Sequence, residues 1–207
     1  MTHLQCLLDM SGQVWQTHTD TLLAPEQFDA LPGPTVVITD YQAAPFGVEA
    51  LPAHHQNLAP LLEKRLRDAG DIDSLARVII HTRERQRDLA QVCYTAVPVA
   101  VAMRYRRWAK QQSDHVLLFP LLEALLTLAQ RQGLESGLLA FVHDDSVDVL
   151  MLQDGQAMQA SSVFICAEWT TISVSLRISP HYWTVTLMLA DNAVACWLSA
   201  ARTKASR

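Results

Sequence analysis

The sequence has few cysteines, and no two of them stand close enough to form a metal pair. They lie far apart, at Cys6, Cys93, Cys166 and Cys196. A zinc or redox site usually needs two cysteines separated by two residues, and four in 207 residues do not make a disulfide framework. Each cysteine lies in an apolar run. We therefore expect four buried, reduced thiols, as in a cytosolic protein.

The sequence also lacks an excess of basic charge. Its formal charge is −5 and its pI is near 5.9, whereas proteins that bind nucleic acid usually carry a basic excess. We therefore expect no nucleic-acid partner. Charged residues make up 18% and hydrophobic residues 50% of the chain, which predicts a folded protein rather than a disordered tail.

An uninterrupted apolar run of membrane-spanning length is missing. The best candidate, residues 182–201, carries Asp191 and Asn192 at its centre, and a central Asp alone costs roughly 2.5–3.5 kcal/mol on insertion. We interpret this region as a strand, 184–191, followed by a helix, 192–204. The N-terminus has neither the basic segment nor the apolar core of a signal peptide. We expect a protein with no membrane span of its own.

Motifs of known catalytic sites are absent as well. The sequence contains no G-x-S-x-G, no P-loop and no H-E-x-x-H. Glu63 and Glu123 each follow a Pro and two Leu residues on a predicted helix. We interpret both as solvated or ion-paired carboxylates. No catalytic residue is therefore predicted.

The stretch "VHDDSVD" near the middle of the chain is the best candidate for a metal site. It offers His143, Asp144, Asp145 and Asp148 as ligands. Successive residues of a strand point to opposite faces, so His143 and Asp144 cannot easily converge on one ion. We interpret the stretch as a loop of a β-meander over 138–164, in which Asp154-Gly155 makes the next tight turn. No metal site is predicted.

What the sequence does contain is an alternation of strand-like and helix-like runs. A leading hairpin followed by helices and strands appears from residue 3 and again from residue 138, which predicts an α/β protein with two lobes. We expect residues 45–52 to pair beside the strand 36–39. The other predicted elements are a hairpin at 3–19, helices at 57–70, 98–112 and 120–133, and strands at 76–82, 91–97 and 115–119.

The strongest charge feature is a basic cluster on the predicted helix 98–112. Val101, Tyr105 and Trp108 fall on one face of this helix. The cluster consists of Arg104, Arg106, Arg107 and Lys110. Two interpretations remain open: a solvated face, or a surface that contacts an acidic partner or anionic lipid headgroups. The neighbouring Trp favours a protein interface slightly, because Arg and Trp are enriched there.

Several segments resemble one protein family. They are "VEALPAHHQNLAPLLEKRL", "VPVAVAMRYRRWAKQQ", "LLFPLLEALLTLA", "VHDDSVDVLMLQDGQAMQASSVF" and "SVSLRISPHYWTVTLMLAD". Together with the two leading hairpins, they resemble the actin-like (ribonuclease H-like) ATPase fold. Within that superfamily the chain is similar to the PilM protein of type IV pili and to the cytoplasmic part of the GspL protein of type II secretion.

This resemblance implies a reduced, two-lobed actin-like α/β fold, with lobes at 1–135 and 136–207 that each open with a β-hairpin. It also implies a non-catalytic scaffold at the cytoplasmic face of the bacterial inner membrane. The implied partners are the cytoplasmic assembly or secretion ATPase and the cytoplasmic segment of an inner-membrane pilus or secretion protein. The basic cluster on helix 98–112 and the cleft between the lobes are the expected contact surfaces.

Actin-like ATPases hold nucleotide phosphates with two hairpin loops that start from an Asp and are rich in small residues. The resemblance implies Asp9, Ser11 and Gly12 in the first loop and Asp144, Asp145 and Ser146 in the second. The second loop has no glycine, and its acidic pair would repel phosphate. We interpret the site as degenerate and expect no cofactor. Two alternatives remain open: an ATPase or small kinase that binds Mg-ATP with Asp9 and Asp144, and an unrelated α/β protein-binding module.

Overall fold

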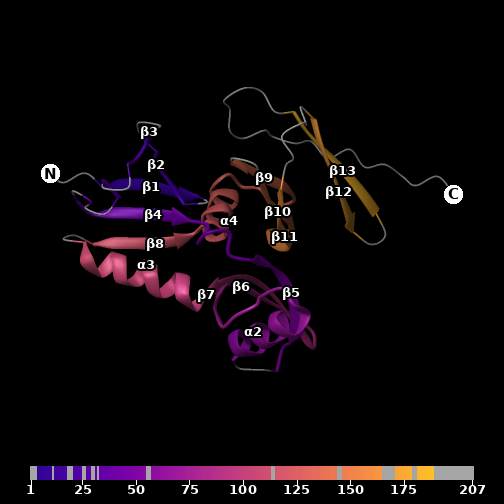
Figure 1. Ribbon diagram of the computed structural model, residues 1–207. Coiled ribbons are helices and arrows are strands. Elements are labelled where there is room, and N and C mark those ends of the chain that lie inside the picture. Colours follow the sequence, from indigo (N-terminus) through magenta and orange to yellow (C-terminus); the bar gives the residue numbers. More distant parts are fainter. Residues whose placement is uncertain are drawn as a thin grey trace. The chain divides into compact units, whose positions relative to one another are not determined.

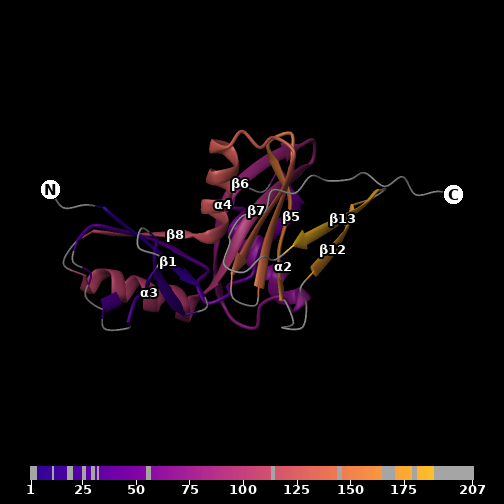
Figure 2. The same cartoon turned by 90° about the horizontal axis from the view of Figure 1, so that it is seen from above.

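The computed structural model describes residues 4–10, 12–17, 21–24, 27–28, 31, 33–54, 57–112, 115–143, 146–164, 171–178 and 181–188. It has mixed α/β architecture (Figures 1 and 2). The chain divides into two compact units, Met1–Thr127 and Leu128–Arg207. The actin-like identity of two lobes at 1–135 and 136–207 stays a prediction.

The first unit contains a five-stranded sheet with the order β3-β2-β1-β4-β8. Strand β2 pairs antiparallel with both β1 and β3, whereas β1, β4 and β8 run parallel to one another. The predicted hairpin at the start of the chain is confirmed. The strands are β1 (Gln5–Met10), β2 (Gln13–Gln16), β3 (Thr21–Leu22), β4 (Thr35–Thr39) and β8 (Val116–Pro120).

A second sheet of the first unit is antiparallel, with the order β5-β7-β6. Its strands are β5 (Phe46–Pro52), β6 (Ala76–Gln86) and β7 (Leu89–Pro98). Helix α2 (Leu58–Ala69) buries Leu58, Leu62 and Leu66 in a core that includes Val92 of β7. The expected pairing of residues 45–52 beside β4 is wrong, because β5 pairs with β7 instead.

Helix α3 (Val99–Gln111) packs against the five-stranded sheet beside β8 (Figure 1). Tyr105 is buried with Tyr41 in a cluster against which the partly buried Leu118 packs, while Trp108 packs on a cluster built around Leu7 and Val37. The predicted amphipathic helix is therefore confirmed, since its apolar side faces the core. The four cationic side chains of the basic cluster, Arg104, Arg106, Arg107 and Lys110, are exposed.

Helix α4 (Leu121–Arg131) leads into the second unit, which contains the predicted meander. Strands β9 (Gly137–His143), β10 (Ser146–Gln153) and β11 (Gln156–Phe164) pair antiparallel in the order β11-β10-β9. Asp154 and Gly155 have φ angles of 52° and 75°, as a tight hairpin turn of the predicted kind requires. A separate pair joins β12 (Thr171–Ile178) to β13 (His181–Met188).

Strand β13 agrees with the strand predicted near residue 184, and the helix predicted at 192–204 lies outside the described residues. Among the helices that the structure describes, none is both long and apolar enough to cross a membrane.

Candidate functional site

The carboxyl ends of β1 and β4 bring a buried acidic side chain together with two hydroxyl groups. Asp9 pairs with Thr39 in the register of these parallel strands, and Asp9 is only 2% exposed. The Thr39 hydroxyl donates to Asp9 Oδ2 at 3.1 Å. The Tyr105 hydroxyl, from α3, donates to the same oxygen. One carboxylate oxygen therefore joins two strands and a helix.

Burial controls the protonation of this group. Desolvation raises the pKa of the Asp9 carboxyl, although the Tyr105 and Thr39 hydrogen bonds and the nearby Arg104 guanidinium oppose the shift. Burial also raises the pKa of the Tyr105 phenol, and the adjacent Asp9 charge adds to this effect. The phenol therefore keeps its proton at neutral pH and remains a donor to Asp9.

A left-handed turn follows β4 directly beside Asp9. Three successive non-glycine residues, Tyr41, Gln42 and Ala43, have φ angles of 52°, 63° and 57°. The Tyr41 N–H donates to the Thr39 hydroxyl at 2.9 Å and the Gln42 N–H to Asp40 Oδ1 at 2.8 Å. Left-handed backbone costs roughly 1–2 kcal/mol per residue, and such strain concentrates at active sites and ligand clamps.

Two cavities flank α3, and Tyr105 lines both. The first, which we name the β2–α3 cavity, has a volume of about 580 Å³. It is lined by Asp9, Gly12, Gln13, Val14, Leu22, Leu23, Phe28, Gln42, Arg104, Tyr105, Arg107, Trp108 and Gln111.

The second, the β8–α3 cavity, has a volume of about 940 Å³. Its lining includes Arg77, Arg106, Lys110 and His115, one acidic side chain, Glu123, and most of strand β8. The basic cluster is therefore divided. Arg104 and Arg107, three residues apart, lie on the β2–α3 side, while Arg106 and Lys110, four residues apart, lie on the other.

The structure brings together only part of the predicted phosphate site. Asp9 and Gly12 line one cavity, and the φ of 82° at Gly12 explains why glycine suits this turn. Ser11, Asp144 and Asp145 lie outside the described residues. Ser146 begins β10 and is buried, 4% exposed. The assignment of a nucleotide to these residues stays a prediction.

Sequence reasoning missed Thr39 and Tyr105 as partners of Asp9. A polar residue at the carboxyl end of a buried strand was the available signal for Thr39, because such ends meet at one edge of a parallel sheet. No comparable signal exists for Tyr105, which looks like an ordinary member of an apolar helix face.

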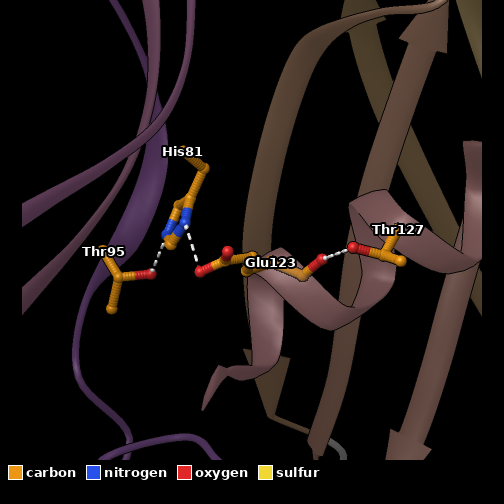
Figure 3. A network of polar contacts seen from close by, with 4 residues as sticks. All are labelled: His81, Thr95, Glu123 and Thr127. Atoms are coloured by element: carbon orange, nitrogen blue, oxygen red, sulfur yellow. Dashed lines mark hydrogen bonds and ion pairs between the residues drawn. The ribbon is translucent and has the colours of Figure 1, made fainter. Parts of the chain in front are cut away.

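A second polar network joins β6, β7 and α4 (Figure 3). The His81 ring lies between Thr95 and Glu123: Nε2 is 2.9 Å from Thr95 Oγ1, and Nδ1 is 3.5 Å from Glu123 Oε2. This order of hydroxyl, imidazole and carboxylate is that of a catalytic triad. However, Thr95 is 4% exposed and lines neither cavity. We therefore interpret the network as structural.

Among the residues that the structure describes, the remaining chemical groups give no sign of a metal or thiol site. Within the part of the chain that the structure describes, no three His, Cys, Asp or Glu side chains gather to hold a metal ion. Cys93 is buried, as predicted, and desolvation raises its pKa to about 12, whereas Cys6 is half-buried. Cys166 and Cys196 lie outside the described residues. Glu63 Oε1 lies 3.8 Å from Arg67 Nη1, as expected of an ion-paired carboxylate.

We predict that Asp9→Asn stabilises the protein at neutral pH by about 0.5–2 kcal/mol. The raised pKa of Asp9 means that the folded state holds the carboxyl proton more tightly than the unfolded state does. The free energy of unfolding therefore falls as pH rises from the pKa of Asp9 in the unfolded chain to its raised pKa in the folded protein. Asn keeps an acceptor for Tyr105 and Thr39 without the buried charge. Urea unfolding at pH 7 measures the change, and the exposed Asp73→Asn is the control. A loss of stability would show that the Asp9 charge is itself stabilising.

We also predict that His81 makes the fold sensitive to acid. Desolvation lowers the pKa of His81 to about 4 from its ordinary 6.5. Between these pH values the unfolded chain holds more protons, so stability rises with pH by up to about 1.4 kcal/mol per unit. His81→Gln should remove this dependence, measured by urea unfolding from pH 7 to pH 5. The variant His115→Gln, at an exposed position, should lose stability between pH 7 and pH 5 as the wild type does. If His81→Gln loses as much stability over this range as the wild type, the prediction is contradicted.

Structural neighbours include two solved proteins. One is a Bacteroides thetaiotaomicron protein with an actin-like ATPase fold and unknown function. It is 8% identical to this chain with a TM-score of 0.42, and the match covers 78% of this chain and 69% of the neighbour's chain. The other is the cytoplasmic domain of EpsL, an inner-membrane component of the type II secretion system of Vibrio cholerae. It is 14% identical to this chain with a TM-score of 0.43, and the match covers 76% of this chain and 71% of the neighbour's chain. No protein-family model and no curated protein matches the sequence. The fold and the GspL-type protein named by the sequence resemblance are thus both among the neighbours, but values this low transfer no function.

Proposed function

We propose that the chain is a non-catalytic adaptor of a bacterial type IV pilus or type II secretion platform. In this role it links the cytoplasmic assembly ATPase to inner-membrane components, at the cytoplasmic face of the inner membrane. The sequence resemblance to PilM and GspL supplies the system and the two partners. The exposed basic side of α3 supplies the binding surface.

The observation that carries the proposal is the side of α3 that lines the β8–α3 cavity. Arg106 and Lys110 are exposed there, together with Arg77. Within the described part of the chain, no carboxylate forms an ion pair with these three side chains. An acidic partner would therefore gain charge pairs without first breaking internal ones, and complementary charge speeds association.

The cavity also follows strand β8, which is the last strand of its sheet. Apolar side chains from this strand, among them the 57% exposed Leu117, lie beside the cations. Apolar groups within a charged surface are typical of protein interfaces. This combination favours a protein partner over a surface that merely meets solvent.

The environment of Asp9 supports a role without catalysis. One of its oxygens already accepts two internal hydrogen bonds, and desolvation disfavours its charged form. A carboxylate that positions Mg²⁺ must be charged and must offer oxygen to the ion. Asp9 is therefore a poor magnesium ligand in this arrangement.

A second candidate function is nucleotide binding by an actin-like ATPase or small kinase. One observation favours it: Asp9 and Gly12, from the predicted first phosphate loop, line the same cavity as Arg104 and Arg107. The third possibility, an unrelated α/β protein-binding module, would use the same basic surface with a partner from another system.

We predict that Arg106→Glu/Lys110→Glu weakens recovery of the assembly ATPase. Both side chains are exposed, so the substitutions should spare folding, with changes within about 0.5 kcal/mol. The tagged wild type and variant are used as bait in extracts of the source cells, followed by mass spectrometry. Purified ATPase is then titrated across a salt series, in which the variant should show slower, less salt-dependent association.

The charge-matched control is Lys64→Glu/Arg85→Glu, which reverses two exposed cations of the same unit that lie on α2 and β6 and line neither cavity. This control should behave as the wild type does. If the wild type recovers no pilus or secretion component, the proposed system is wrong. If it recovers one and the α3 variant binds equally well, the basic side of α3 is only a solvated surface.

Nucleotide binding has a separate test. We expect Mg-ATP to bind more weakly than a Kd of about 1 μM, which corresponds to roughly −8 kcal/mol, because Asp9 is buried and internally bonded. Isothermal titration calorimetry of the wild type and Asp9→Asn measures this. Micromolar or tighter binding that Asp9→Asn abolishes would replace the adaptor proposal with the second candidate.

A further inference from the structure

We propose that the β2–α3 cavity is a binding site for a small amphipathic anion, with an apolar ring body and one carboxylate- or sulfonate-type group. This site lies on the other side of α3 from Arg106 and Lys110. It therefore goes beyond the proposed adaptor function and does not depend on it.

The size and lining of the cavity fit such a body. Its volume of about 580 Å³ lies within the roughly 300–1,000 Å³ of small-molecule sites. The apolar part of the lining combines Val14 and Leu23 with the rings of Phe28 and Trp108. Leu22 also lines the cavity although it is 52% exposed. A bound ring would cover this apolar side chain.

The aromatic wall is held in place before any ligand arrives. Phe28 and Trp108 stack with ring centroids 4.3 Å apart and planes 18° from parallel. The Trp108 Nε1–H donates to the Phe28 carbonyl oxygen at 3.1 Å. Two side chains fixed in this way lose little further freedom on binding, which favours affinity.

The charges of the lining favour an anion. Arg104 and Arg107 contribute +2, and Asp9, whose charged form burial disfavours, is the one carboxyl group among the described lining residues, so these three groups are net positive in either protonation state of Asp9. Arg104 is also close enough to Asp9 to lower the carboxyl pKa, and it lies 6.0 Å from the centre of the Tyr105 ring. Arg107 is therefore the cation left to meet an anion, since no carboxylate of the described residues pairs with it.

Side-chain amides complete the polar part of the lining. Gln13, Gln42 and Gln111 all line the cavity, and each carries two N–H donors. The left-handed turn holds Gln42 there, with its backbone N–H bonded to Asp40. Strained backbone of this kind clusters at ligand sites.

The test uses 8-anilino-1-naphthalenesulfonate, a ring system with one sulfonate, as the probe. Calorimetry and fluorescence titration of the whole chain should show saturable binding of one probe per chain. N-phenyl-1-naphthylamine, which has the same rings without the anionic group, should bind at least about tenfold more weakly, because it loses the charged hydrogen bond to Arg107.

Matched variants locate the site. Arg107→Gln and Leu22→Asp should each weaken sulfonate binding about tenfold or more, the first by removing the cation and the second by placing a carboxylate in the lining, which repels the sulfonate. Arg106→Gln and Leu117→Asp are the controls, since they change an exposed cation and an exposed leucine of the β8–α3 cavity. Urea unfolding checks that all four variants keep their fold.

Three outcomes would overturn the proposal. One is that no saturable binding occurs. Another is that the neutral probe binds as tightly as the sulfonate, which would mean a merely apolar surface. The third is that binding is abolished by Arg106→Gln and Leu117→Asp but not by Arg107→Gln and Leu22→Asp.

Discussion

The hydrogen bonds to the buried side chain of Asp9 are the interactions that join the parallel strands β1 and β4 of the first unit to α3. A carboxyl group at the end of a sheet strand loses its water, and it is tolerated there only when hydrogen bonds replace that water. Thr39 supplies one bond from the neighbouring parallel strand, and Tyr105 supplies another from α3. Two strands and a helix therefore share one oxygen atom. The same Thr39 hydroxyl accepts the Tyr41 N–H, so the left-handed turn belongs to this arrangement as well.

The position of α3 explains why the two cavities beside it differ in their lining. Tyr105 extends from the helix into the core and lines both of them. On one side of it, the helix presents cations beside an aromatic pair and a strained turn. On the other side, it presents cations beside an edge strand with exposed apolar side chains. We propose that the first environment binds a small amphipathic anion and that the second binds an acidic protein surface.

Elements with a strong local pattern were predictable from the sequence. The α2 leucines recur at helical spacing, and Asp154-Gly155 supplies the positive φ of a tight turn, so these signals need no distant partner. Pairing that depends on distant residues was not predictable. Strand β5 was expected beside β4, yet it joins β7, about 45 residues further along the chain. Periodicity identifies a strand but does not identify its neighbour.

The sequence by itself determined that α3 is amphipathic and that its four cations meet solvent, because a period of 3.6 residues places them away from the apolar face. It also determined that Asp9 lies at the end of a strand, one residue before its last, next to a glycine turn. Only the tertiary structure decided that Asp9 would be bonded by Tyr105, which lies 96 residues away in sequence. It alone divided the cations between two cavities and placed His81 against Glu123. These contacts arise from packing between elements, and neither residue type nor local spacing carries that information.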